Sequence, residues 1–232
     1  MNLFDLIIAA VLLLSVVYSV YRGAVQTVLN VGALILAVLL AYPLSLPLSD
    51  AVAGNTAITS QLLTYTDAVA RVGDVELANT PVTGLAPETM EQVLDNVGLP
   101  PALTEILRRN LESGSRIESD RTVNDYVQSA VLASAIRILS FLLSALAVYI
   151  VLALVISLFN FVFHFPLVRG IDWAVSALFG LARGAMLAAL LFLLVPLFMT
   201  AIPLDIFREM LSGSTLAAHF MNTSFFTGIY FS

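Results

Sequence analysis

The stretch ILSFLLSALAVYIVLALVISLFNFVF, residues Ile138–Phe163, decides the fold class because it is long, apolar and free of charged side chains. A helix needs about 20 consecutive apolar residues to cross the roughly 30 Å hydrocarbon core of a bilayer. Three further stretches approach or exceed that length: Leu3–Tyr21, Val25–Tyr42 and Gly184–Ile202. The sequence therefore predicts an all-α, multipass membrane protein with four transmembrane helices.

The composition indicates the same class. Hydrophobic residues make up 59% of the chain and charged residues only 11%, whereas ordinary soluble domains contain about 25% charged residues. Too little polar surface is available to cover a water-soluble globule, so the lipid bilayer is the first expected partner. The excess of 16 acidic over 10 basic residues argues against a nucleic-acid partner, which calls for a clustered basic patch.

The residue types of most enzyme and metal sites are scarce. The chain has no Cys, which excludes disulfides, thiolate metal sites and Cys catalysis, and its two histidines, His164 and His219, lie far apart. It contains no P-loop, no dinucleotide-binding glycine pattern and no His-Glu-x-x-His motif. We therefore expect no catalytic residue, no metal site, no cofactor and no enzymatic activity.

The expected spans divide the chain into four segments. In chain order these are a transmembrane hairpin (1–48), an acidic extracytoplasmic loop with short helices at 87–96 and 101–111 (49–128), transmembrane helices 3 and 4 (129–204) and a C-terminal tail (205–232). An interfacial or re-entrant helix is expected between helices 3 and 4, at 171–182, because this apolar segment is too short to span alone.

Turn signals set the expected helix ends in the hairpin. Gly23 can take the left-handed conformation that ends a helix, and Arg22 suits the negative end of the helix dipole. Helices 1 and 2 are therefore expected to form a tight antiparallel pair. Pro43 and Pro47 should stop helix 2 near Tyr42, since proline prevents regular continuation.

Helix 3 has a recognisable start. Thr122 is a suitable N-cap, with Asp125 three residues later. From there the chain can run as one helix of about 40 residues to Phe163, which is about 60 Å long at 1.5 Å per residue.

Small residues at four-residue spacing predict helix packing. Ser176, Gly180, Gly184 and Ala188 form such a stripe near helix 4, and Ala33, Ala37 and Ala41 form another on helix 2. In lipid, helices associate where small side chains let backbones approach. Helices 2 and 4 are thus candidate partners, either within one chain or, alternatively, across a dimer.

Charged residues near the expected membrane boundaries bear on topology. Arg22, Arg169 and Arg183 lie in short connections and mark the cytoplasmic side. The acidic loop and both termini are then extracytoplasmic. Asp5 and Asp172 also lie at expected boundaries, where carboxylates can cap helices or face headgroups.

A family resemblance rests on two motifs. Asp5, Tyr21–Gly23, Gly32 nine residues later and Ala41–Tyr42 together resemble the opening of the CvpA family, the colicin V production proteins. The stretch Ser176–Gly184, which includes Gly180, resembles the family's Leu-Gly-x-x-x-Gly-x-x-Arg-Gly sequence before the last helix. The first small position is Ser here, where the family usually has Gly.

The resemblance implies a bacterial inner-membrane protein linked to colicin V production or export and to envelope homeostasis. We expect it to be non-enzymatic and to act through helix packing with a membrane or secretion partner, or as a homo-oligomer. The alternative is a small transporter or channel subunit in which Asp5, Asn30, Arg137 and Asn160 would line a polar path between protomers. A third class, an intramembrane serine hydrolase, would use a helix serine with His164.

The topology can be tested by labelling. The chain has no Cys, so single Cys residues placed at Ala86 or Asn96 report directly on the loop. Both should react with a membrane-impermeant thiol reagent in intact cells or spheroplasts, and a Cys at Arg22 should be protected. Protection of both loop positions together with labelling at Arg22 would invert the topology.

Overall fold

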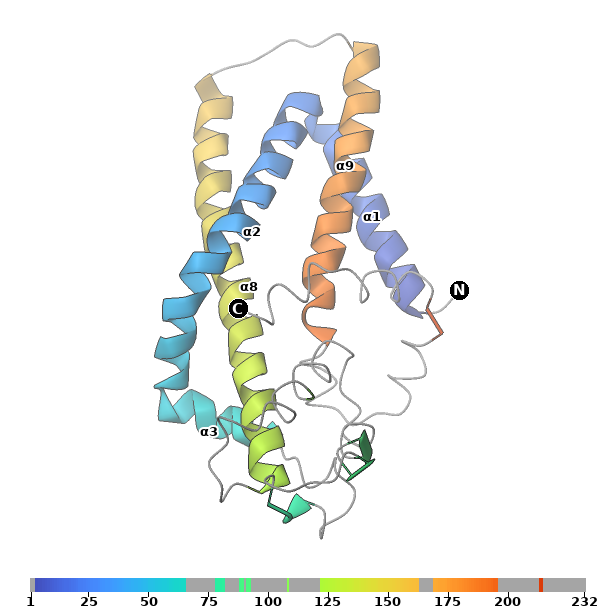
Figure 1. Cartoon of the computed structure of the whole chain (residues 1–232). Helices are drawn as coiled ribbons and strands as arrows, with labels where there is room; N and C mark the ends of the chain where they lie inside the picture. Colours follow the sequence, from blue (N-terminus) through green and yellow to red (C-terminus); the bar gives the residue numbers. More distant parts are fainter. Residues whose placement is uncertain are drawn as a thin grey trace. The chain divides into compact units, whose positions relative to one another are not determined.

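The computed structural model describes residues 3–65, 78–81, 88–89, 91–92, 108, 122–162, 169–195 and 213–214. Figure 1 shows its helices α1 (Leu3–Arg22), α2 (Ala24–Ala53), α3 (Thr56–Tyr65), α8 (Val123–Val162) and α9 (Arg169–Phe192). Helices α1, α2, α8 and α9 are long and apolar enough to cross a membrane. The predicted all-α class with four candidate spans is confirmed.

The chain divides into two compact units. One comprises residues 1–48, 139–194 and 205–222, and the other comprises 49–138, 195–204 and 223–232. The expected short helices at 87–96 and 101–111 lie outside the described residues, except that residues 88–89, 91–92 and 108 are helical. The candidate functional features described below all belong to the first unit.

Gly23 alone separates α1 from α2. Its φ of 88° lies in the left-handed region, and its N–H donates a 3.0 Å hydrogen bond to the carbonyl of Ser19, which closes α1. The predicted glycine stop is confirmed. The tight antiparallel pairing of the two helices is not found, since α1 and α2 diverge from this point and α1 packs along α9 instead. A link of one residue is shorter than the two to five residues that join antiparallel helices.

Helix α2 runs through Pro43 and Pro47 to Ala53, so the expected end near Tyr42 is wrong. Each proline lacks a backbone N–H and frees the carbonyl four residues earlier. Membrane helices tolerate this because Ser and Thr side chains and local adjustments supply other hydrogen bonds. Between the prolines, Oγ of Ser45 donates to the carbonyl of Tyr42 at 2.8 Å, but the carbonyls that the two prolines free are those of Leu39 and Pro43.

Helix α8 begins and extends as predicted. The N–H of Asp125 donates to Oγ1 of Thr122 at 3.2 Å, which is the expected N-cap bond. The N–H of Val123, the first residue of α8, has no partner within the helix and donates to the carbonyl of Thr80 at 3.0 Å. The helix has 40 residues and is therefore about twice as long as the hydrocarbon core is thick.

Helix α9 is continuous from Arg169 to Phe192. The expected interfacial helix at 171–182 and a separate span from Gly184 are therefore wrong. A glycine inside a helix costs only about 1 kcal/mol relative to alanine, and close packing can offset that cost. The candidate span is Asp172–Phe192, so Arg183 lies near its middle and not in a turn.

Replacing Gly23 by Ala should lower the free energy of unfolding by about 1 to 2 kcal/mol, because a Cβ in the left-handed region crowds the backbone. Lack of space is not the cause, since an added Cβ would lie 3.5 Å from the nearest atom, Oδ2 of Asp172. The measurement is chemical unfolding of the full chain in detergent. Gly23→Asn is the matched control and should cost less, because Asn enters this region more readily. Wild-type stability of Gly23→Ala would rule out the strain.

Candidate functional site

The contact between α1 and α9 is built on two glycines. A Cβ added at Gly180 would lie 2.7 Å from Cβ of Ser19 and 3.0 Å from Cα of Val16. A Cβ added at Gly184 would lie 3.0 Å from Cβ of Ser15. Side chains cannot fit at such distances without moving the helices apart. We call these four positions, Ser15, Ser19, Gly180 and Gly184, the glycine interface; their order shows that α1 and α9 run antiparallel.

A buried hydrogen bond crosses the glycine interface. Oγ of Ser15 donates to the carbonyl of Gly180 at 2.8 Å, and this bond is available only because the helix backbones approach closely. Interhelical hydrogen bonds of this kind contribute about 1 kcal/mol in membranes. Ser19 and Ser176 are also buried, and their Oγ atoms have no hydrogen-bond partner within the described part of the chain. Their small size is what the packing uses.

The glycine stripe does not have the partner expected from sequence. Gly180 and Gly184 face α1, so the prediction that they pack on the alanine stripe of helix 2 is wrong. The alanines themselves, Ala33, Ala37 and Ala41, are buried. Gly32 has no atom within 4 Å of an added Cβ, so it is not a position of close approach in the described structure.

Asp172 joins α9 to the junction of α1 and α2. Its Oδ1 accepts a 2.7 Å hydrogen bond from the N–H of Ala24, the first residue of α2. A carboxylate at this position satisfies an orphan donor and suits the positive end of the helix dipole. Asp172 thus has the capping role expected for it. Asp5, near the other end of α1, is buried and accepts a 2.6 Å hydrogen bond from Oγ of Ser214.

Arg183 begins near the middle of a candidate span. Its Cζ lies 4.9 Å from the centroid of the Tyr18 ring, and Nη2 donates to the hydroxyl of Tyr149 at 3.4 Å. Cζ of Arg22 lies 5.3 Å from the same Tyr18 ring. Within the described residues no carboxylate pairs with Arg183, and its Nε is buried without a hydrogen-bond partner. Charged residues inside a membrane are costly and mark functional positions.

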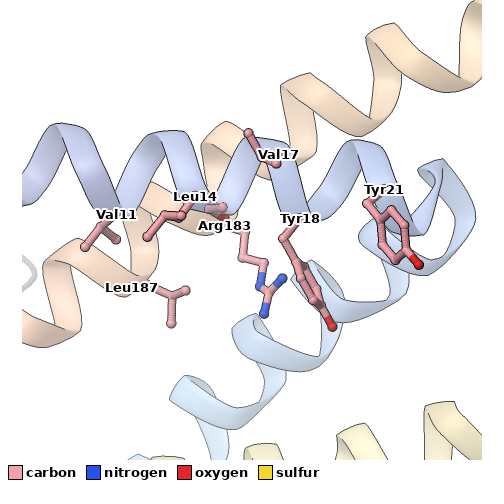
Figure 2. Close-up of a pocket in the computed structure, with 8 residues that line it drawn as sticks. Val11, Leu14, Val17, Tyr18, Tyr21, Arg183 and Leu187 are labelled. Atoms are coloured by element: carbon pink, nitrogen blue, oxygen red, sulfur yellow. The ribbon is translucent and has the colours of Figure 1, made fainter.

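An open groove of about 680 Å³ lies beside Arg183 (Figure 2). We call it the Arg183 groove; it is lined by Val11, Leu14, Ser15, Val17, Tyr18, Tyr21, Arg183 and Leu187. Figure 2 shows the guanidinium group next to the Tyr18 ring, with Val11, Leu14 and Leu187 farther along the groove. The groove therefore has a cationic end and an apolar end. The sequence did not predict this groove, because the Arg183-Gly184 pair was expected to form a turn and not to lie inside a helix.

The other described residues that the sequence singled out lie on separate helices. Arg169 begins α9, and Asn30 is buried on α2. Arg137 is exposed on α8. The side chain of Asn160 and all of His164 lie outside the described residues. Among the described residues, no group of three or more His, Cys, Asp or Glu side chains could hold a metal ion.

The helices and the glycine interface define an α-helical multipass membrane protein. Residues 117–224, slightly less than half of the chain, match the family model described as Colicin V production protein, so this part of the chain is similar to that family. The matched residues include Ser176–Gly184 but not the motif from Asp5 to Tyr42. No match was found among curated proteins or among solved structures.

Replacing Gly180 by Ala should lower the free energy of unfolding by about 1 to 3 kcal/mol, because the new methyl group overpacks the contact with Ser19. The measurement is unfolding of the full chain in detergent, followed by helical circular dichroism. Gly32→Ala is the matched control: it meets open space and should be neutral or stabilising by up to about 1 kcal/mol. Equal stability of the two variants would show that the close approach at Gly180 is not needed.

Proposed function

We propose that this chain is a non-enzymatic protein of the bacterial inner membrane that serves toxin production or export and envelope homeostasis by binding a membrane or secretion partner. The observation that carries this proposal is the match of residues 117–224 to colicin V production proteins. The described structure adds a physical reason. Its most tightly constrained feature is a helix-packing interface, which suits a role in assembly.

The glycine interface would fix the surface that a partner meets. With α1 held against α9 by close backbone contact, the outward side of α1 presents large apolar side chains in a defined arrangement, including Leu6 and Leu13. Partner helices in a membrane recognise such a surface by van der Waals packing. A wider spacing of α1 and α9 would change that surface without preventing membrane insertion.

The orientation is part of the proposal. The bond from Ala24 to Asp172 puts the end of α1 and the start of α9 at the same end of the first unit. Arg22 and Arg169 belong to these helix ends, and short basic segments favour the cytoplasm. This end would therefore be cytoplasmic, with the termini and acidic loop outside. Arg183 does not contribute to the argument because it lies within the span.

A complementation experiment tests the function. In a host that secretes colicin V and lacks its own protein of this family, the wild-type chain should restore secreted toxin, measured as growth inhibition of a sensitive strain. Gly180→Leu should reduce the restored toxin by about fivefold or more, since overpacking costs about 1 to 3 kcal/mol. It should still insert, because Leu is favourable in a membrane span.

Leu178→Ala provides the control on the same helix, because Leu178 is 67% exposed. It should restore toxin secretion nearly as well as the wild type, at equal amounts of protein in the membrane fraction. Failure of the wild-type chain to change toxin secretion would refute the proposed function. Full activity of Gly180→Leu would separate the function from the glycine interface.

A further inference from the structure

Two arginines lie against one aromatic ring in the first unit, and no carboxylate among the described residues pairs with them. The Cζ atoms of Arg183 and Arg22 lie 4.9 Å and 5.3 Å from the centroid of Tyr18. In the described part of the chain, neither guanidinium group forms an ion pair. The cation–π contacts offset only part of the cost of charge in a membrane. An external anion would supply the missing counter-charge.

The two ends of the Arg183 groove match the two parts of an amphiphilic ligand. Its cationic end is formed by Arg183 and Tyr18, and its other end is lined by Val11, Leu14 and Leu187 (Figure 2). Leu14 is 66% exposed and Val17 is 58% exposed, so the groove opens on a face that lipid can reach. A polar head and an attached hydrocarbon chain would each meet a matching surface.

The depth of the charge fits a headgroup. Although Arg183 begins near the middle of the span, its guanidinium reaches Tyr18, which is one helical turn, about 6 Å, from Arg22 at the end of α1. This is the snorkelling expected of a long cationic side chain. The guanidinium forks of Arg are suited to two parallel hydrogen bonds with phosphate oxygens.

We propose that the Arg183 groove binds an anionic phospholipid, with its phosphate held by Arg183, the positive charge of Arg22 beside the same Tyr18 ring, and one acyl chain along Val11, Leu14 and Leu187. The bound lipid should carry a net negative charge. Arg183 and Arg22 have no carboxylate partner among the described residues, and a zwitterionic lipid would add a cation of its own beside them. This binding does not rest on the proposed role in toxin production.

Native mass spectrometry of the full chain in detergent tests the proposal. Phosphatidylglycerol and phosphatidylcholine with identical acyl chains are compared by the abundance of their one-lipid adducts. Phosphatidylglycerol adducts should exceed those of phosphatidylcholine by about fivefold or more, the effect of one or two arginines near an anionic headgroup. Arg183→Gln should remove most of this preference and Arg22→Gln part of it. Arg137→Gln, an exposed arginine of the second unit, should leave it unchanged.

Two further arms keep the result decisive. Leu14→Trp retains both arginines but fills the apolar end of the groove, so it should lower the abundance of phosphatidylglycerol adducts even if Arg183→Gln fails to fold. Glycerol 3-phosphate in molar excess should not displace the lipid, because it lacks the acyl chains. Equal adducts with the two lipids, wild-type adducts in both Arg183→Gln and Leu14→Trp, or full displacement by glycerol 3-phosphate would each overturn the proposal.

Discussion

The close approach of α1 to Gly180 and Gly184 of α9 is the constraint on which the first unit depends. Lipid tails are as apolar as leucine, so burial of apolar surface gives membrane helices little reason to associate. Contact must come from dispersion between closely spaced backbones and from interhelical hydrogen bonds. The glycine interface provides both, since the absence of side chains at Gly180 and Gly184 also brings the carbonyl of Gly180 within 2.8 Å of Oγ of Ser15.

The positions of three other described features of this unit depend on that contact. With α1 and α9 antiparallel, Asp172 reaches the first N–H of α2, and Arg183 reaches the ring of Tyr18. At the opposite end of the same pair, the rings of Phe4 and Phe192 lie 6.3 Å apart. The glycine interface thus positions Asp172, near the start of α9, to cap α2. It also positions the Arg183 groove partway along α9.

The fold class followed from the sequence because it depends on one-dimensional properties. Three local features were each sufficient to predict one part of the structure. The length and apolarity of Ile138–Phe163 predicted a membrane span, Thr122 predicted the start of α8, and Gly23 predicted the end of α1. The errors came from three-dimensional effects. Pro43, Pro47 and Gly184 are local helix breakers, but a membrane setting and close packing allow α2 and α9 to continue through them.

The candidate site was harder to predict because several surfaces carry the same signal. Ser15 and Ser19 on α1 and the alanines on α2 all offer small residues to a glycine stripe, and sequence spacing cannot select among them. The Arg183 groove was missed for a related reason. The Arg183-Gly184 pair is typical of a turn, so the sequence predicted that Arg183 marks the cytoplasmic side of the membrane. The continuity of α9 instead places this arginine within the span.

Disulfide trapping in this Cys-free chain tests the central claim that α9 packs through its glycines on α1. In place of Gly184, a Cβ would lie 3.0 Å from Cβ of Ser15, so a separation of the helices by about 0.8 Å gives the roughly 3.8 Å found in disulfides. The account predicts that the Ser15→Cys, Gly184→Cys pair crosslinks within one chain on mild oxidation, and that the Ala37→Cys, Gly184→Cys pair does not. Crosslinking of the second pair, with none in the first, would contradict the account and place the glycine stripe on α2.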